Sequence, residues 1–267
     1  MTRGVARLAQ LYGGLLRAEL QAASAYRAQL LLSVFSWVAP LAFLALWRNA
    51  ASAEPVGGIE PGQFTTYFCV LLVTVNLQLS MPVVFSFGYL VYEGQLSAML
   101  LRPHHVMHTI VARAIAEKAY GLAPLVVAVP FMLALAGGAV EASGGAMLMA
   151  AAIVVLGTIA LSYLAAMAGC IAFWMTKAQG VQGLLVGAEW VLGGIVAPVV
   201  LLPGALPTLA RHQPLWYADG AAPEIISGIS RPGVGLLLEA AVWIGVLHVA
   251  FQWLWRRGMR QYEAVGT

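Results

Sequence analysis

Six long apolar stretches, separated by short segments rich in Gly, Pro or charged residues, constrain the fold of this chain. Each stretch is long enough to cross a bilayer, because about 20 apolar helical residues span the hydrocarbon core. The chain is 61% hydrophobic and 9% charged, whereas a soluble domain carries about 25% charged residues. We therefore expect an all-α integral membrane protein with six transmembrane helices. The expected spans are 30–47, 66–91, 110–135, 146–174, 181–202 and 234–255.

The basic residues predict which loops face the cytoplasm. Eleven of the 14 Lys and Arg residues, Lys118 among them, fall on one side of the expected spans, and only Arg48, Arg211 and Arg231 fall on the other. Because positively charged loops stay in the cytoplasm, we expect both termini there. The predicted division is a cytoplasmic interfacial helix at 1–29, a transmembrane domain at 30–256 and a cytoplasmic tail at 257–267.

Two stretches outside the spans are also partly apolar. Leu8, Leu11 and Leu15 recur at helical spacing, opposite a face rich in Arg and Gln, which is typical of a helix lying in the membrane interface. A plain cytosolic leader is the alternative. The segment at about 203–232 contains five prolines and many Leu, Ile, Trp and Tyr side chains, so we expect short helices there that dip into the outer leaflet.

A short segment of mixed polarity follows the second span. Gly94 permits a sharp exit from the preceding helix, and Pro103 ends whatever helix lies between them. Leu96, Met99 and Leu100 recur at three- and four-residue spacing, which predicts one or two turns of amphipathic helix. Such a helix is too short to span a bilayer, so we expect it either to lie on the membrane surface or to dock into a groove of another protein.

Motifs of enzymatic chemistry are absent from the sequence. It contains no Gly-x-x-x-x-Gly-Lys-Ser/Thr loop that would cradle the phosphates of ATP, and no His-Glu-x-x-His or Cys-x-x-Cys motif. Cys69 and Cys170 lie in apolar runs, where small buried side chains are usual. His104 and His108 are the best-spaced pair for a metal, but loop polarity explains them better. We expect no enzyme active site, no metal, no cofactor bound by this chain and no nucleic-acid partner.

One carboxylate, Glu189, falls inside the fifth expected span. A charge at that depth costs several kcal/mol unless it is protonated, paired or hydrated. Glu189 therefore either lines a substrate path or donates a hydrogen bond to a neighbouring helix as a neutral acid. His248 lies at comparable depth in the sixth span, and a pairing of the two is a hypothesis. Asn76 and Ser80 share a face of the second span and are further candidates for the path, although interhelical hydrogen bonding is the stronger expectation.

Small residues and prolines give two more predictions. Gly183 and Gly187 form a Gly-x-x-x-Gly spacing, which lets two helix backbones approach closely, so the fifth span is a candidate subunit interface. Prolines inside helices usually kink them. The prolines inside the expected spans are Pro40, Pro82, Pro124, Pro130 and Pro198.

The order of these features resembles the permease subunits of ABC-2-type exporters. The shared features are an amphipathic helix at 5–25 that leads through Ala25-Tyr26-Arg27 into the first span, six spans with both termini inside, and a long apolar loop before the sixth span. The most specific match is the segment at about 92–103, which looks like the coupling helix of those permeases. Its residues are Glu93, Gly94, Leu96, Ser97, Met99, Leu100, Arg102 and Pro103.

Within that family, the chain is most similar to the branch that pairs two different permeases with one ATPase type and includes exporters of viologen-like cations. The resemblance implies a fold like that of type V exporters. It implies that two permeases, identical or paralogous, associate through their first and fifth spans in a bacterial plasma (inner) membrane, among its lipids. They would move an amphiphilic, lipid-like or drug-like substrate out of the cytoplasm or the inner leaflet.

The resemblance also implies partners. Separate nucleotide-binding ATPase subunits would bind ATP and Mg, and Leu96, Met99 and Leu100 would fill a groove of that partner. Two other interpretations stay open. One is an ATP-independent secondary transporter that uses Glu189 and His248, and the other is a membrane scaffold that transports nothing.

Overall fold

The computed structural model describes residues 2–24, 37–122, 125–136, 142–175 and 178–265. Every regular element within these ranges is a helix. The expected junction between the interfacial helix and the first span at 29 and 30, the Ala25-Tyr26-Arg27 motif and the predicted kink at Pro124 lie outside the described residues.

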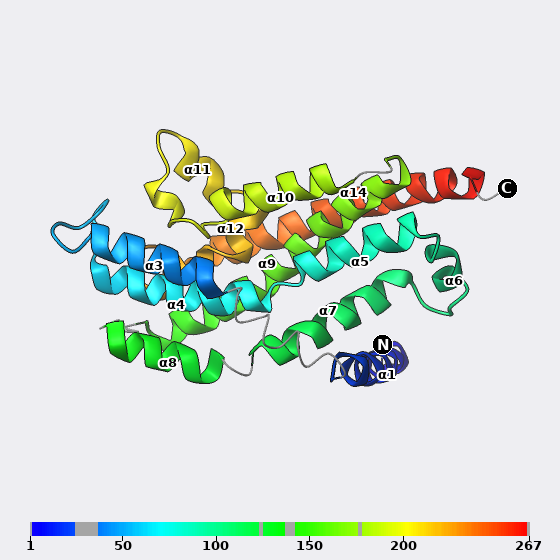
Figure 1. Cartoon of the computed structure of the whole chain (residues 1–267), viewed down its shortest axis with the longest axis horizontal. Coiled ribbons are helices and arrows are strands. Elements are labelled where there is room, and N and C mark those ends of the chain that lie inside the picture. The colour runs from blue at the N-terminus through cyan, green and yellow to red at the C-terminus, as the bar shows by residue number, and fades with distance from the viewer. Residues whose placement is uncertain (1, 25–36, 123–124, 137–141, 176–177, 266–267) are drawn as a thin grey trace.

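Two uninterrupted helices form the centre of the bundle. The helix α9 (Gly144–Cys170) is capped by Ser143 and continues into the short helix η2 (Ile171–Phe173). The helix α14 (Val234–Val265) packs along α9, and Figure 1 shows the two running along the long axis of the molecule. Of the described residues, only these two helices are long and apolar enough to cross a membrane.

The other expected spans are shorter or interrupted in the described chain, so the structure does not show six unbroken transmembrane helices. The second expected span is divided at Gln78 and Leu79, and the helix of the fifth ends at Leu192, well before its predicted end at 202. The helices concerned are α3 (Val38–Ala50), α4 (Pro61–Leu77), α5 (Ser80–Tyr92), α7 (Val106–Leu122), α8 (Leu125–Ala136) and α10 (Gln179–Leu192).

Local chemistry explains both interruptions. A proline at position 82 has no N–H to donate to the Gln78 carbonyl, and a proline ring clashes with that carbonyl in a continuous helix. Gln78 accordingly has an extended backbone, with φ −64° and ψ 136°. After α10, Gly194 has φ 92°, which side chains disfavour. Irregular backbone inside a membrane needs internal partners, and Tyr67 Oη donates to the Gly194 carbonyl at 2.7 Å.

The remaining prolines of the expected spans occupy different kinds of position. Pro130 lies inside α8, as a kinking proline would. Pro40 lies in the first turn of α3, where the missing N–H has no partner to lose. Pro198 immediately precedes the short helix η3 (Val199–Leu201).

The long apolar loop before α14 is packed into the bundle. Residues 214–225 are buried, and a Cβ added at Gly157 of α9 would overlap the backbone carbonyl of Tyr217. Glu224 is fully buried and accepts a hydrogen bond from Arg211 Nη2 at 3.2 Å. The short helices of this loop are α11 (Leu206–Arg211), α12 (Pro214–Ala218) and α13 (Ala221–Ile226).

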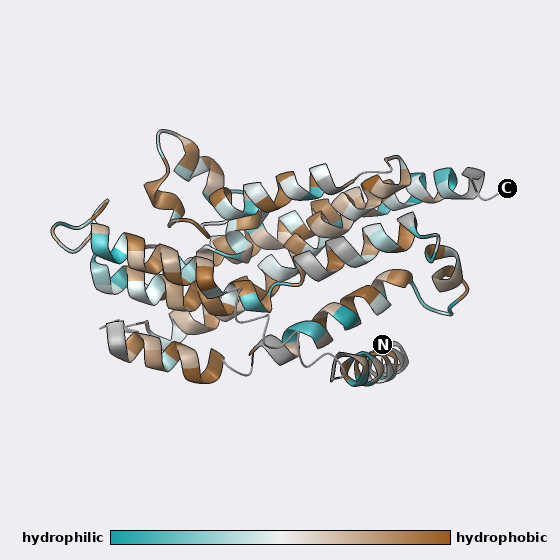
Figure 2. Cartoon of the chain, in the orientation of Figure 1, coloured by the Kyte–Doolittle hydropathy of each residue, from teal (hydrophilic) through white to brown (hydrophobic). Residues whose placement is uncertain are grey.

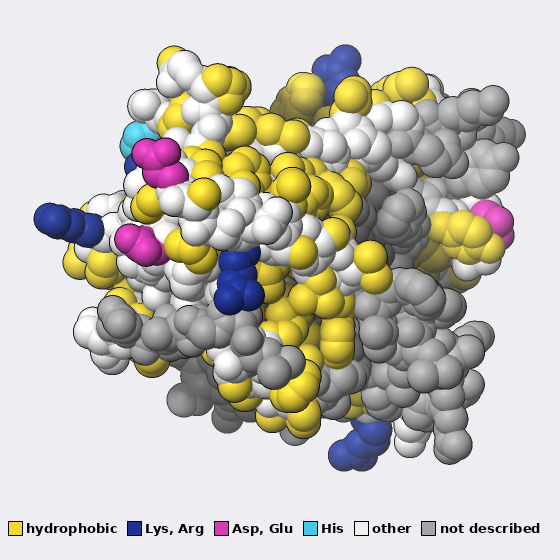
Figure 3. All heavy atoms as spheres, turned by 60° about the vertical axis from the view of Figure 1, so that its left-hand side comes forward, with side chains coloured by type: hydrophobic (Ala, Val, Ile, Leu, Met, Phe, Trp, Pro, Cys, Tyr) yellow, Lys and Arg dark blue, Asp and Glu magenta, His cyan; other side chains and the backbone are white. Residues whose placement is uncertain are grey.

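Figure 1 shows what lies at each end of the bundle. The helix α6 (Leu96–Leu100) and the C-terminus lie at one end, and α11 with the turn between α3 and α4 lies at the other. The helix α1 (Thr2–Ser24) packs against α7 and is seen nearly end-on, so its axis crosses that of the bundle. Apolar residues colour the helices between the two ends in Figure 2, and Figure 3 shows apolar side chains over much of one face with few charges. This is the arrangement of a membrane-embedded helical bundle.

Candidate functional site

The helix α6 turns the chain back at one end of the bundle. Glu93 follows the last residue of α5, and Gly94 turns the chain with φ 70°, a conformation open to glycine. The helix itself is a single turn of five residues. The structure therefore has a short helix, α6, at the position that the spacing of Leu96, Met99 and Leu100 predicted.

The inward side of α6 is anchored by one leucine. Leu96 is fully buried in a cluster that includes Phe87 of α5, Phe173 of η2 and Trp255 of α14. The ring centroids of these three aromatic side chains are 5.5–6.0 Å apart. The sequence placed Leu96 in a groove of a partner, and the structure packs it against its own bundle instead. Burying a leucine contributes about 1.5–3 kcal/mol, and this leucine is already buried within its own chain.

The outward side of α6 is apolar and open. Leu101 is 88% exposed and Leu100 is 40% exposed, whereas Met99 is partly buried against the aromatic cluster. Leu100 is the last residue of α6 and Leu101 follows it directly, so two exposed leucines at the end of an anchored helix form a surface suited to contact with another protein. The other residues expected in the coupling segment are also exposed, namely Glu93, Gly94, Ser97, Arg102 and Pro103.

The C-terminal part of α14 reaches α6. The hydroxyls of Ser97 and Tyr262 are hydrogen-bonded at 2.8 Å. The Tyr262 ring also lies 6.0 Å from that of Phe173, and a Cβ added at Gly258 would overlap the Phe173 ring. A displacement of α6 would therefore act directly on α14.

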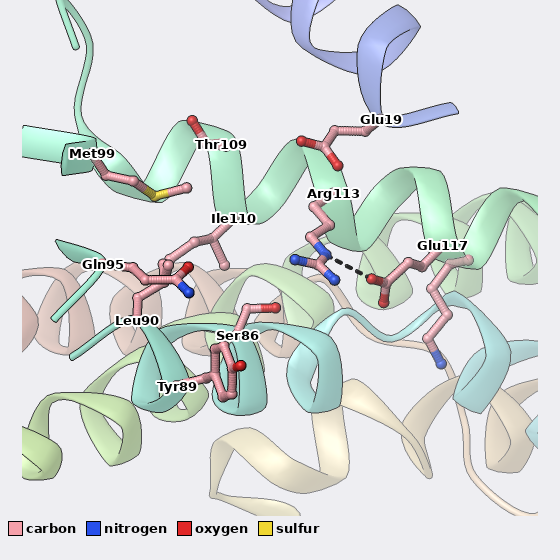
Figure 4. A pocket seen from close by; sticks show the side chains of 11 residues that line it. Glu19, Ser86, Tyr89, Leu90, Gln95, Met99, Thr109, Ile110, Arg113 and Glu117 are labelled. Carbon is pink, nitrogen blue, oxygen red and sulfur yellow. Dashed lines mark hydrogen bonds and ion pairs between the residues drawn. The ribbon is translucent and has the colours of Figure 1, made fainter. Parts of the chain in front are cut away.

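A cavity of about 660 Å³ opens beside α6, between α1, α5 and α7 (Figure 4). Gln95 and Met99 line it close to α6. On α7, Arg113 Nε donates to Glu117 Oε1 at 2.9 Å, and Figure 4 shows Glu19 of α1 projecting towards Arg113. The cavity therefore combines apolar walls with a strip that carries both signs of charge.

Lys118 lines the same cavity and connects it to the interior of the bundle. Lys118 was expected among the cytoplasmic flanking residues, but its Nζ donates to the Val75 carbonyl of α4 at 3.4 Å. In an unbroken helix that carbonyl would accept from the amide of Leu79, and the break before α5 frees it. Glu189 and Asp219 interact electrostatically with Lys118. A cation is tolerated at such depth where a free carbonyl and carboxylates compensate it.

The carboxylates near Lys118 come from α10 and the apolar loop. Asp219 is fully buried, and neither of its carboxylate oxygens has a hydrogen-bond partner in the described chain. Its backbone carbonyl lies 3.5 Å from Thr74 Oγ1, and Gln78 Nε2 donates to the carbonyl of Ala218. Glu189 is buried in the last turn of α10 and not at the middle of a long helix. We call Lys118, Glu189 and Asp219 the buried polar centre.

The polar residues predicted on the second span flank the break between α4 and α5. Asn76 is 5% exposed, and its Nδ2 donates to the Leu72 carbonyl of its own helix at 2.7 Å. Ser80 is the first residue of α5, and its side chain lies outside what the structure describes. The hydrogen bond of Asn76 is therefore within one helix and not between two.

The hypothesised pairing of Glu189 with His248 is replaced by other contacts. His248 is exposed on α14, where its Nδ1 lies 2.9 Å from the Tyr163 hydroxyl, and it lines a second cavity. Glu189 interacts electrostatically with Lys118 and Asp219 instead. The structure thus places the two titratable groups in different surroundings.

The predicted interface glycines lie on an open face of α10. A Cβ added at Gly183 or Gly187 would meet no atom within 4 Å. Leu184 is 75% exposed and Trp190 is 38% exposed on the same helix. A single copy of the chain leaves this face uncovered.

The architecture and these features define the class of protein: a helical membrane protein with a short exposed helix at one end and a charged cavity beside it. The family described as ABC-2 family transporter protein matches residues 41–266. The chain belongs to this family, whose members are the membrane components of ABC transporters and not the ATPase. A search of the curated proteins finds no match to the chain.

Leu101, Lys118 and Asp219 are prominent in the structure but were not among the site residues expected from the sequence. Leu101 extends the apolar run that contains Met99 and Leu100. The sequence does not show that Leu101 is exposed, because it does not show that the helix packs on the bundle through Leu96. Lys118 falls inside the span expected at 110–135. A charged residue within an expected span was the sequence signal that it is buried. Asp219 lies in a loop rich in apolar residues, where a lone carboxylate gives no signal of burial.

Proposed function

We propose that this chain is the membrane-spanning subunit of an ATP-driven exporter that works with separate ATPase subunits in a bacterial inner membrane. The observation that carries the proposal is the exposed pair Leu100 and Leu101 at the C-terminal end of a helix that Leu96 anchors to the bundle. The family match covers α6 and supports an ATPase as the protein that contacts it. ATP and Mg would then bind to that partner.

Movement of the ATPase would pass through α6 to the bundle. Leu96 contacts the aromatic cluster shared by α5, η2 and α14, and Ser97 contacts Tyr262 at the end of α14. Two routes therefore lead from the docking helix, one to the broken helix α5 and one to the uninterrupted helix α14. With both termini in the cytoplasm, α6 lies on the side of the membrane that holds ATP.

The cavity beside α6 is the proposed start of the substrate path. Its walls carry apolar side chains such as Leu90 and Ile110 together with Arg113 and Glu117, which suits an amphiphilic, lipid-like or drug-like substrate more than a free ion. Lys118 joins this cavity to the buried polar centre at the break between α4 and α5. Breaks of this kind at polar sites are common where transporters bind substrate.

The open face of α10 is the proposed contact with a second permease, either an identical copy or a paralogue. Gly183 and Gly187 allow close approach of another helix, and the exposed Leu184 and Trp190 would be covered by it. A pair of different permeases would fit the branch that the sequence resembles most.

Co-purification of the tagged chain from native membranes tests the proposal. We expect a phosphate-loop ATPase, with or without a second six-span protein, in the purified complex. Recovery of the folded chain alone in a mild detergent would contradict the exporter and favour an ATP-independent transporter.

Leu101→Asp and Leu100→Asp test the docking surface. We expect either variant to lower transport-stimulated ATP hydrolysis at least about tenfold, because a charge placed in an apolar contact costs about 1–3 kcal/mol or more. Leu209→Asp on α11 is the matched control, since Leu209 is 61% exposed at the opposite end of the bundle. Stimulated hydrolysis equal to that of Leu209→Asp would remove α6 as the docking helix.

A further inference from the structure

A second cavity, of about 470 Å³, lies between α1, α7, α9 and α14. It shares no lining residue with the cavity of Figure 4. In the part of the chain that the structure describes, its lining contains no Asp, Glu, Lys or Arg. Its polar side chains are Tyr12, His105, His108, Thr158, Ser162, Tyr163, His248 and Gln252. We call it the histidine cavity.

Two hydrogen-bonded tyrosine–histidine pairs line this cavity. The Tyr12 hydroxyl of α1 lies 3.0 Å from His108 Nδ1 of α7, and the Tyr163 hydroxyl of α9 lies 2.9 Å from His248 Nδ1 of α14. If the hydroxyl donates, the neutral imidazole carries its hydrogen on Nε2; if Nδ1–H donates, the hydroxyl hydrogen is not used by the pair. Each pair therefore keeps one donor beyond its own hydrogen bond, whichever tautomer is present.

His105 supplies a third donor. Its Nδ1 accepts a hydrogen bond from the Met107 amide at 3.2 Å, so the ring hydrogen is on Nε2. Burial and then the neighbouring His108 lower the pKa of His105, which keeps the ring neutral near pH 7. The described residues of the lining thus offer three histidine-based donors and no carboxylate that would repel an anion.

Two helices that line the histidine cavity also carry exposed apolar side chains. On α14, Val242, Val246, Val249 and Trp253 are 53–68% exposed, and Ile159 of α9 is 40% exposed. A surface of this kind faces lipid in a membrane protein. The helices α9 and α14 therefore expose apolar side chains to lipid, and exposed Ile159 also lines the cavity.

The depth of the cavity matches a lipid headgroup region and the adjoining acyl chains. His248 precedes Arg256, the first of three arginines near the end of α14, by eight residues, which is about 12 Å of helix at 1.5 Å per residue. His105 lies in the loop before α7, at the same end of the bundle as α6. The cavity therefore extends from the membrane surface on the side of the chain termini towards the interior.

We propose that the histidine cavity binds the anionic headgroup, phosphate or carboxylate, of an amphiphile in the leaflet on the side of the chain termini. The headgroup oxygens would accept from His105 and from the two tyrosine–histidine pairs, and the acyl chain would lie along the apolar face of α14. This site is separate from the export path and does not depend on an ATPase. It is a lipid site at the periphery of the bundle, between α1, α7, α9 and α14.

Native mass spectrometry of the purified full-length chain in a neutral detergent tests the site. We expect one molecule of phosphatidylglycerol to be retained in preference to phosphatidylcholine. The variant Tyr12→Phe/His108→Leu removes every side-chain donor of one pair, and we expect it to weaken retention at least about tenfold, since hydrogen bonds to a charged group are stronger than those between neutral groups. Tyr163→Phe/His248→Leu removes the donors of the other pair and should weaken retention to a similar extent. This second variant decides the matter if the first fails to fold.

His212→Leu is the matched control. His212 contacts Glu239 at the opposite end of the bundle, so its loss should leave lipid retention as in the wild type. Equal retention of phosphatidylcholine, or unchanged retention in both double variants, would overturn the proposal. Inorganic phosphate is the remaining arm: if it raises the melting temperature as much as phosphatidylglycerol does, the ligand is a soluble anion and the lipid source is overturned.

Discussion

At the scale of single residues, Lys118 has the most unusual position. It lies within α7, yet its ammonium group donates to a carbonyl of α4 and interacts electrostatically with two carboxylates. The carbonyl is free because the helix breaks after Leu77. A backbone interruption and a membrane cation thus stabilise each other.

Lys118→Met tests that relation. We expect the free energy of unfolding in detergent to fall by about 1–3 kcal/mol, because the Val75 carbonyl and the nearby carboxylates lose their partner. Arg113→Met is the control, since the Arg113 side chain is 58% exposed and surface ion pairs contribute about 0–1 kcal/mol. Equal stability of the two variants in a chemical unfolding titration would contradict the role of Lys118.

Gly157 is a second residue whose role follows from packing. A Cβ there would overlap the Tyr217 carbonyl, which is backbone and not a flexible side chain. We expect Gly157→Ala to destabilise the protein by about 1–3 kcal/mol. Gly183→Ala should keep the stability of the isolated chain or raise it by about 0.5–1 kcal/mol, because α10 is open there and alanine favours helix. Thermal unfolding that ranks the two variants in the opposite order would contradict this packing.

At the scale of elements, α6 has two sides with different roles. Leu96 holds it to the aromatic cluster, whereas Leu100 at its end and Leu101 directly after it are exposed. The five residues of α6 form too short a helix to be stable alone. Its position therefore depends on Leu96 and on the Ser97–Tyr262 hydrogen bond.

Alanine substitutions separate the two sides of α6. We expect Leu96→Ala to lower the free energy of unfolding by about 2–5 kcal/mol, as large-to-small changes in a core do. Leu101→Ala should change it by about 0.5 kcal/mol or less, as surface substitutions do. If denaturant unfolding shows the same loss for both, α6 is not anchored in the way described.

At the scale of the whole molecule, the orientation of the bundle is open to a direct test. Cys69 and Cys170 are both free and fully buried. We expect an impermeant maleimide to leave the wild-type protein unlabelled in intact cells and in inverted vesicles, and to label it only after denaturation. Ser52→Cys, in the exposed turn after α3, should be labelled from outside intact cells, and Arg260→Cys only in inverted vesicles. The reverse pattern would invert the proposed topology.

The sequence by itself determined the class of protein and the position of the short helix. Apolar stretches leave a chain no stable state in water, so membrane insertion follows from composition. The spacing of Leu96, Met99 and Leu100 between Gly94 and Pro103 was enough to predict α6, because caps and helical periodicity are local properties. The family match agrees with the resemblance that these features carried.

Only the tertiary structure decided which side of each helix is used. Sequence spacing could not show that Leu96 faces inward, because an amphipathic turn looks the same against its own bundle and against a partner. The break before α5 placed Lys118 beside Val75, and the packing of the apolar loop brought Asp219 towards Glu189. These contacts join residues that are far apart in the chain. Long-range packing, and not local propensity, therefore built the buried polar centre and the histidine cavity.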